Sequence, residues 1–242
     1  MIQVIASKDR YFADHGWLQT RWHFSFSDYY DPQNMQWGAL RVFNDDVIQP
    51  GQGFGMHPHR DMEIVTYVLE GALEHRDSLG NTGVIHPGEV QVMRAGTGIV
   101  HSEYNHSKTE PLHLLQLWIL PRSKGLVPRW EQQRFSREAR AGLLLPVVSA
   151  GNGNGKSAAA AIPGTMQIDQ DATIYLSSLA AGQQAAHAGA AGRKAYLFVT
   201  AGEVQVNGSA IAAGDQARIA DEPRLEIMAQ KDAEFILLDL PS

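Results

Sequence analysis

Cysteine is absent from this chain of 242 residues. Disulfide bonds and thiolate chemistry are therefore excluded, and any bound metal must use nitrogen and oxygen ligands. Long apolar runs are absent too, since none approaches the roughly 20 residues that a membrane-spanning helix needs. Residues 1–10 contain no basic flank followed by a long apolar core, so we expect no signal peptide and a cytoplasmic protein.

Clusters of lysine and arginine are also missing. The formal net charge is −6 and the isoelectric point is about 5.9. A chain with this charge is a poor direct partner for nucleic acid or for an anionic membrane, although contact with another protein stays open. Helical periodicity is scarce as well. Only residues 131–143, which are rich in Glu, Gln, Arg and Ala, predict a short connecting helix.

Short strand signals, in contrast, run through the whole chain. Hydrophobic residues make up 44% of the sequence, which is enough material for a large core. β-branched and aromatic residues gather in short segments that end at turn-forming residues. These segments are residues 2–5, 40–44, 63–71, 90–93, 113–120, 174–179, 195–202, 203–206 and 235–240. Their spacing predicts an all-β protein built from sandwiches or barrels.

The second half of the chain reads as a weaker copy of the first. A Gly- and Ala-rich loop is expected at residues 150–161, and after it residues 195–202 parallel residues 64–71. The second copy contains a single histidine, His187, and no His-x-His pair. We therefore expect two domains, residues 1–136 with the chemistry and residues 137–242 without metal ligands.

Two short motifs in the first half carry the chemistry. His57-Pro58-His59 and His101-Ser102-Glu103 each place two polar residues two positions apart, and such residues point to the same face of a strand. A lone His-x-His is a weak signal, but a second pair follows here, and glycines precede both pairs. If the two strands are neighbours, three imidazoles and one carboxylate surround a divalent transition metal and leave room for water, dioxygen or substrate.

These motifs resemble those of the cupin barrel, and more closely those of the pirin family. The resemblance lies in residues 57–63, 69–71, 95–105 and 128–132, is strong over residues 1–135, and departs from the cupin pattern at Ala95, where a proline is usual. It implies two cupin jelly-roll barrels in tandem, the second one degenerate. It also implies that His57, His59, His101 and Glu103 bind the metal, while Glu63 supports them by a hydrogen bond. We expect iron, with copper, nickel, manganese, zinc and cobalt as alternatives.

The resemblance points to the bacterial branch of quercetin 2,3-dioxygenases. It implies that dioxygen opens the central ring of a flavonol and that carbon monoxide and a depside are released. Glu103 would then be the catalytic base for the flavonol 3-hydroxyl proton. Aromatic candidates for the pocket wall, each of which is also a plausible core residue, are Phe24, Phe26, Phe43 and Trp118.

Two other functions remain open from the sequence. The pirin family includes redox-sensing regulatory proteins, in which the same ligands would report the oxidation state of the metal. Another cupin chemistry, such as isomerisation, would use the same fold and ligands. The sequence also leaves two roles for His75, which either lines the pocket or stabilises the turn that follows it.

Overall fold

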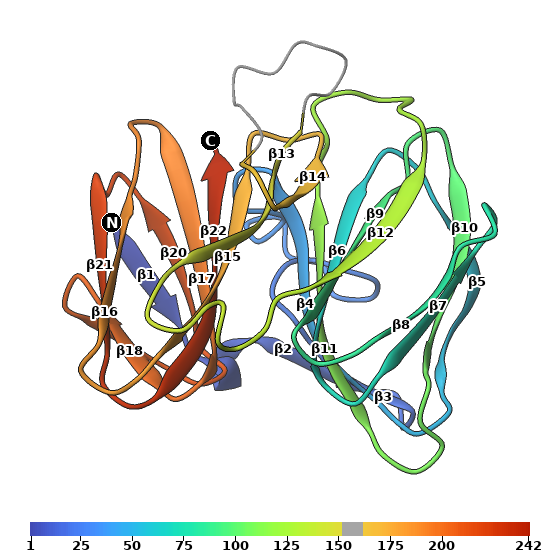
Figure 1. The fold of residues 1–242 in the computed structure, drawn as a ribbon, viewed down its shortest axis with the longest axis horizontal. Helices are drawn as coiled ribbons and strands as arrows, with labels where there is room; N and C mark the ends of the chain where they lie inside the picture. The colour runs from blue at the N-terminus through green and yellow to red at the C-terminus, as the bar shows by residue number, and fades with distance from the viewer. Residues whose placement is uncertain (152–161) are drawn as a thin grey trace.

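The structure is a computed structural model that describes residues 1–151 and 162–242. Apart from a single 3-10 turn, η1 (Ser7–Asp9), its regular elements are all β-strands, and they form two barrels side by side (Figure 1). The predicted all-β class with two tandem cupin barrels is confirmed. Most of the Gly- and Ala-rich loop expected at 150–161 lies outside the described residues.

The N-terminal barrel is formed by two facing sheets. The larger sheet has the strand order β12-β9-β6-β11-β4-β3-β2 and the smaller one β5-β10-β7-β8. The strands of the larger sheet are β2 (Tyr11–Asp14), β3 (Leu18–Trp22), β4 (Leu40–Ile48), β6 (Glu63–Glu70), β9 (Glu89–Arg94), β11 (Leu112–Ile119) and β12 (Arg129–Arg134). Those of the smaller sheet are β5 (Gly53–His59), β7 (Leu73–Asp77), β8 (Thr82–Ile85) and β10 (Ile99–Asn105).

The C-terminal barrel repeats this arrangement. Its sheets have the orders β1-β20-β17-β22-β15-β13-β14 and β16-β21-β18-β19. The larger sheet contains β1 (Ile2–Ile5), β13 (Leu145–Ala150), β14 (Met166–Ile168), β15 (Thr173–Leu179), β17 (Arg193–Ala201), β20 (Gln216–Ala220) and β22 (Ala233–Pro241). The smaller sheet contains β16 (Gln184–Ala188), β18 (Glu203–Val206), β19 (Ser209–Ala212) and β21 (Arg224–Ala229).

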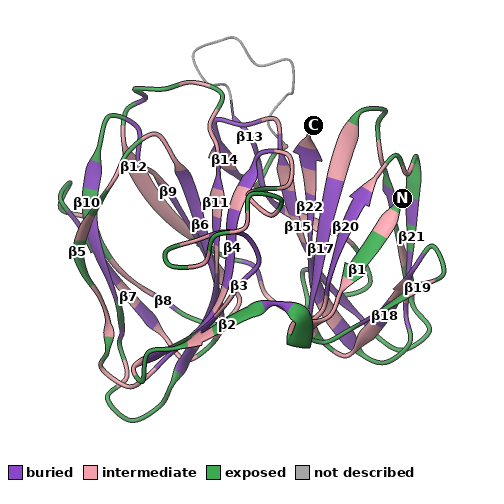
Figure 2. Ribbon diagram, turned by 180° about the vertical axis from the view of Figure 1, so that it is seen from behind, coloured by how far each residue is buried: buried purple, intermediate pink, exposed green. Residues whose placement is uncertain are grey.

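The first strand of the chain belongs to the second barrel. Ile2 pairs with Ile219 and Ile5 pairs with Gln216, so β1 forms an edge of the C-terminal sheet. The chain then passes through η1 and β2 into the N-terminal barrel (Figure 2). We expected a domain boundary at residue 136, but the N-terminal strand β1 lies in the barrel formed mainly by residues after that position. The chain therefore links the two barrels at its N-terminus as well.

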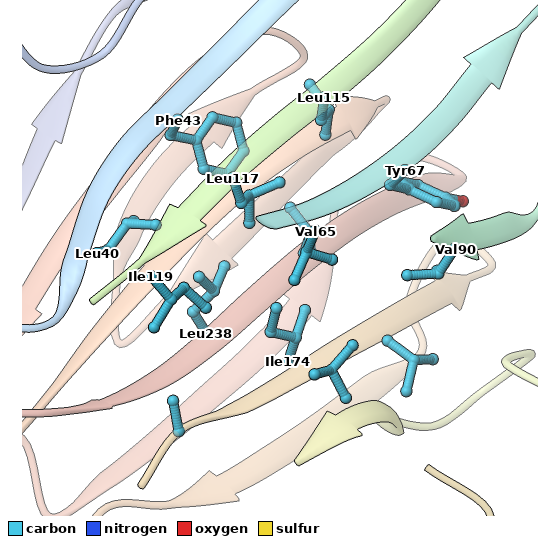
Figure 3. Packing of buried hydrophobic residues seen from close by; sticks show 14 of the residues in the cluster. Leu40, Phe43, Val65, Tyr67, Val90, Leu115, Leu117, Ile119, Ile174 and Leu238 are labelled. Carbon is cyan, nitrogen blue, oxygen red and sulfur yellow. The ribbon is translucent and has the colours of Figure 1, made fainter. Parts of the chain in front are cut away.

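The two large sheets pack against each other through one shared apolar cluster. Phe43 on β4, Val65 on β6 and Leu117 on β11 come from the N-terminal barrel, and Ile174 and Leu238 come from the C-terminal barrel (Figure 3). Burying this surface is the main favourable term that holds the barrels together. The large sheets thus face the interface, which leaves the smaller N-terminal sheet, with β5 and β10, on the outer side (Figure 1).

The short helix predicted over residues 131–143 is wrong. Residues 129–134 form β12, which pairs antiparallel with β9 from Arg129 opposite Arg94 to Arg134 opposite Glu89. Helix propensity is worth only a few tenths of a kcal/mol per residue, roughly, and is easily overridden. Here the pairing with β9 satisfies backbone groups along one edge of β12, and Trp130 packs against two apolar clusters of the N-terminal barrel.

Candidate metal centre

The two histidine-containing strands are neighbours, as the prediction requires. β5 and β10 pair antiparallel with His101 directly opposite His57, and Ile99 lies opposite His59. The register shifts between His101 and Glu103, where β10 has an irregularity. The strand pairing and the alternating direction of side chains along each strand bring His57, His59 and His101 together. Their ring centroids are 4.4 to 4.9 Å apart.

The spacing of these nitrogens fits a metal ion. The Nε2 atoms of His57 and His101 are 3.0 Å apart, and one nitrogen from each of the three histidines lies within 4.8 Å of the others. Two nitrogens that are each about 2.1 Å from one ion, at right angles, are about 3.0 Å apart. Nδ1 of His57 lies 2.7 Å from the carbonyl oxygen of Gly55, to which it donates, and this leaves the Nε2 lone pair for the site.

Two of the histidines are held in the neutral form that binds metals. Burial, together with the neighbouring histidines, lowers the pKa of His59 to about 4. Burial also lowers the pKa of His101 to about 4, although the charge of Glu103 opposes this shift. At neutral pH both imidazoles are therefore unprotonated, so no proton has to leave these two rings before a metal binds.

Glu103 lies beside this group as a fully buried carboxylate. Its Oε1 accepts a hydrogen bond from Gln91 at 3.0 Å, and its Oε2 accepts one from Gln116 at 2.6 Å. Burial raises the pKa of Glu103, but His101, His75 and the two amides outweigh that effect, and the net pKa lies below its usual value. Glu103 is grouped with His75 and His101 within 4.8 Å, rather than with the three-histidine set.

His75 contacts the predicted ligand His101, and the sequence did not predict this contact. Nδ1 of His75 lies 3.4 Å from Nδ1 of His101, and Nε2 of His75 lies 3.3 Å from Oδ2 of Asp77. Trp130 stacks on the His75 ring at 5.2 Å with an interplanar angle of 10°. The only sequence signal was His75 standing two residues before Asp77 on one strand, which is weak by itself.

Aromatic side chains flank the histidines on the open side. The Trp118 ring lies 4.9 Å from that of His59, and the Phe54 ring lies 6.2 Å from that of His57. Both histidines are only partly buried, whereas His101 is fully buried. A small molecule would therefore reach the site past His57 and His59.

The other predicted wall residues lie elsewhere. Phe24 and Phe43 belong to the core cluster between the barrels, and Phe26 touches Trp118 edge-on at 5.4 Å. Of the four aromatic candidates, only Trp118 contacts a predicted ligand among the described residues. Phe54 was not recognised, because nothing in the sequence distinguishes it from an ordinary strand residue.

Glu63 has different partners from those expected. It begins β6 and is fully buried, and its Oε1 accepts hydrogen bonds from Nε of Arg94 at 2.7 Å and from the amide of Asp169 at 2.9 Å. Among the described residues, one of these hydrogen bonds stays within the N-terminal barrel and the other crosses to the C-terminal barrel, and neither reaches a predicted ligand. Burial raises the pKa of Glu63 in spite of the nearby Arg94 charge.

Among the described residues, the corresponding sheet of the second barrel shows no similar cluster of histidines. β16 and β21 take the places of β5 and β10 in the strand order, and His187 on β16 lies opposite Leu225. Leu225 and Ile227 on β21 belong to an apolar cluster. His187 instead lies 3.4 Å from Asp239. The strand that corresponds to β10 thus contributes apolar side chains to the core of the second barrel.

Comparison with known families agrees with the two-barrel architecture. The profile of the Pirin family matches residues 5–119, and that of the "Quercetinase C-terminal cupin domain" matches residues 157–240. The protein named "Quercetin 2,3-dioxygenase" from Escherichia coli K12 is 46% identical over 242 residues, which cover 100% of this chain and 99% of that protein. A "Pirin-like protein" from Caulobacter vibrioides is 46% identical over 227 residues, or 94% of each chain.

A solved structure has the same two-barrel fold. The crystal structure of the bacterial pirin YhhW from Escherichia coli in complex with nickel(II) superposes with a TM-score of 0.90 and 45% identity, covering 100% of this chain and 99% of that one. No helix in the described part of the chain has the length and apolar character to cross a membrane. By both its sequence and its fold, this chain belongs to the pirin family.

Proposed function

We propose that this chain is a metal-dependent dioxygenase that opens the central ring of a flavonol such as quercetin, releasing carbon monoxide and a depside. The observation that carries the proposal is the convergence of His57, His59 and His101 beside the buried carboxylate of Glu103. The relatives named quercetin 2,3-dioxygenase support the substrate class.

The four residues would hold one divalent transition ion. When bound, such an ion supplies Lewis-acid stabilisation of the deprotonated 3-hydroxyl oxygen of the flavonol. The donor set contains neutral imidazoles and one carboxylate and no thiolate, which suits iron, nickel and the other late first-row metals. Iron remains our expectation for the resident ion, and the nickel complex of the related pirin makes nickel the first alternative to test.

In this proposal Glu103 takes the substrate proton. The amides of Gln91 and Gln116 hold its two oxygens, and its lowered pKa keeps it ionised at neutral pH. A carboxylate in this state accepts a proton only from a strongly acidified hydroxyl, and the Lewis acidity of a bound ion would provide that acidity. The rings of Trp118 and Phe54 flank the histidines and provide apolar contact for a flat polyphenol.

The test is reconstitution of the protein with single metals under anaerobic conditions, followed by quercetin and dioxygen. We expect loss of flavonol absorbance and release of carbon monoxide in equal amounts with at least one metal. Glu103→Gln should abolish turnover while retaining part of the metal binding, and Glu110→Gln, at an exposed position of the same segment, should leave both unchanged. A fully metal-loaded protein without turnover would refute the proposal and favour the redox-sensing function.

A further inference from the structure

The carboxylate of Glu103 is held from the opposite wall of its barrel. Glu103 lies on β10 of the smaller N-terminal sheet, whereas Gln91 and Gln116, which donate to its two oxygens, lie on β9 and β11 of the larger sheet (Figure 1). The two glutamines belong to one row across that sheet, because Gln116 lies opposite Thr66 and Thr66 lies opposite Gln91. The strand register therefore sets where both amides meet the carboxylate.

Each glutamine amide is fixed at its other end by a tryptophan. The indole nitrogen of Trp118 donates to Oε1 of Gln116 at 3.2 Å, and the two residues share one face of β11 because they are two positions apart. The indole nitrogen of Trp130, on the neighbouring strand β12, donates to Oε1 of Gln91 at 2.8 Å. The hydrogen bonds thus run from one indole to the other through both amides and the carboxylate.

The chemistry of these groups favours one orientation of the amides. An indole nitrogen only donates, and an ionised carboxylate only accepts. An amide between them must therefore present its oxygen to the indole and its NH2 group to the carboxylate. Without the indole, a glutamine amide can turn over and present its oxygen to Glu103, which would repel the carboxylate instead of holding it. The tryptophans thus determine which end of each amide faces Glu103.

The two glutamines differ in how firmly they are held. The amide nitrogen of Gln91 also donates to the hydroxyl of Thr66 at 3.3 Å, and both of these residues are fully buried. Among the described residues, the hydrogen-bond partners of the Gln116 side chain are Glu103 and Trp118. The orientation of Gln116 therefore depends more strongly on its tryptophan, and removal of an indole N–H group should have the larger effect at Trp118.

The same two tryptophans contact the histidines of the site. The Trp118 ring meets that of His59 edge-on, with an interplanar angle of 83°. The Trp130 ring stacks on that of His75, which in turn contacts His101. Each tryptophan therefore fixes the carboxylate through its nitrogen and supports one side of the histidine cluster with its ring.

We propose that Trp118 and Trp130 are positioning residues of the metal centre, whose indole N–H groups fix the amides that place Glu103 beside the predicted histidine ligands. The inference rests on the proposed function only in requiring that the site binds a metal ion, and it does not depend on the substrate. Groups behind the ligands influence metal affinity because a ligand that is already in place loses less freedom when the ion binds.

The test is the affinity of the full-length protein for cobalt(II), measured by competition with a chromophoric chelator. Gln116→Met, which retains a side chain of similar length without the amide, should lower the affinity about 10- to 100-fold. Trp118→Phe, which keeps an aromatic ring and removes the N–H group, should lower it about 10-fold. Trp130→Phe should have a smaller effect, because the hydroxyl of Thr66 also holds its glutamine.

The double variant Trp118→Phe/Gln116→Met shows whether the indole acts through the amide. If it does, the double variant should bind cobalt(II) within about 3-fold of Gln116→Met alone, since the indole has no amide left to orient. A packing defect from the smaller ring would instead add to the loss. Fully additive losses would therefore overturn the proposal, as would unchanged affinity in Gln116→Met. If Trp118→Phe does not fold, the same cycle with Trp130→Phe and Gln91→Met decides the question.

The absorption spectrum of bound cobalt(II) is a second readout, because its ligand-field bands depend on how the ligands are placed. At saturating cobalt(II) the bands of Trp118→Phe should differ from those of the parent chain, and unchanged bands would contradict a positioning role. Trp37→Phe is the control, since it removes an indole hydrogen bond to the carbonyl oxygen of Ala195 between the barrels. It should leave the bands unchanged and the affinity within about 2-fold.

Neither readout requires a flavonol. A parent chain that binds cobalt(II) in the competition assay but turns over no quercetin with any metal would refute the dioxygenase function, and the variants would still decide this inference. A parent chain with turnover whose variants keep the parent's affinity and bands would refute only this inference. A parent chain that binds no cobalt(II) would overturn both.

Discussion

Nδ1 of His101 faces Nδ1 of His75 at 3.4 Å, so the predicted ligand is connected to a second histidine behind it. His75 in turn lies 3.3 Å from the carboxylate of Asp77, which also accepts hydrogen bonds from the amides of Leu79 and Asn81. A hydrogen-bonded partner on the far nitrogen of a metal-binding histidine fixes its tautomer and its ring orientation. The series Asp77, His75, His101 therefore aims Nε2 of His101 at the metal position.

Replacement of His75 by phenylalanine tests this role. Phenylalanine retains the stacking on Trp130 but removes the nitrogen that faces His101. Loss of such a partner typically lowers metal affinity about 10- to 100-fold, and we expect a decrease in that range. Competition with a chromophoric chelator measures it. His86→Phe, at an exposed position, is the control, and equal affinities in the two variants would show that His75 acts only in packing.

The clustering of His57, His59 and His101 was predictable in part, because the two members of each motif are related by local geometry. In each motif the two side chains are two residues apart on one strand, which places them on one face whatever the remainder of the fold. The meeting of the two motifs also required the pairing of β5 with β10, which the matching histidine motifs suggested. The His75–His101 contact required the pairing of β7 with β10, which no matching motif indicates. The pairing of β1 with β20 was not predicted either, because Ile2 and its partner Ile219 lie near opposite ends of the chain.

The incorrect helix over residues 131–143 has a related cause. Its composition favours a helix in isolation, but the energy difference is small compared with that of strand pairing and burial. β9 offers an open edge to residues 129–134, and Trp130 donates from its indole nitrogen to Gln91 at 2.8 Å inside the barrel. Tertiary contacts that no local pattern reveals therefore determine this segment.

Asp46 makes the stability of the protein depend on pH. Burial, with added repulsion from Asp45 and Glu103, raises its pKa to about 7. Between about pH 4 and pH 7 the folded state therefore holds a proton that the unfolded state releases, and the free energy of unfolding decreases as the pH rises through this range.

The variant Asp46→Asn should lose this dependence. Relative to the parent chain it should be more stable at pH 8, by up to about 4 kcal/mol, and similar in stability at pH 4. Urea unfolding of the metal-free protein at both pH values measures the difference, since a bound cation would itself shift the titration. A constant difference between the two chains at pH 4 and pH 8 would contradict the raised pKa.

Gly96 lies in the turn that directs the chain back into β10. Its φ is +47°, and a Cβ atom there would lie 2.0 Å from the carbonyl oxygen of Leu126. Gly96→Ala should therefore lower the free energy of unfolding by more than about 3 kcal/mol, through both strain and a backbone clash. Gly80 has a φ of +89° with open space around it, so Gly80→Ala should cost only about 1 kcal/mol. If chemical denaturation gives similar decreases in the free energy of unfolding for Gly96→Ala and Gly80→Ala, the turn at Gly96 must relax to avoid the clash.

Substitution of Glu63 tests whether this residue stabilises the interface between the barrels or helps the predicted ligands to bind a metal. Its carboxylate contacts Arg94, whose side chain is 15% exposed, and the amide of Asp169 in the other barrel. Glu63→Ala leaves a largely buried guanidinium and an amide without their partner, which should cost about 3 kcal/mol in denaturant unfolding. Glu74→Ala removes surface pairs with Arg76 and His106 and should cost less than about 1 kcal/mol. Because the hydrogen bonds of Glu63 reach none of the predicted ligands, metal affinity should change less than about 2-fold in both variants. A large loss of metal affinity with unchanged stability in Glu63→Ala would instead establish the supporting role that the sequence suggested.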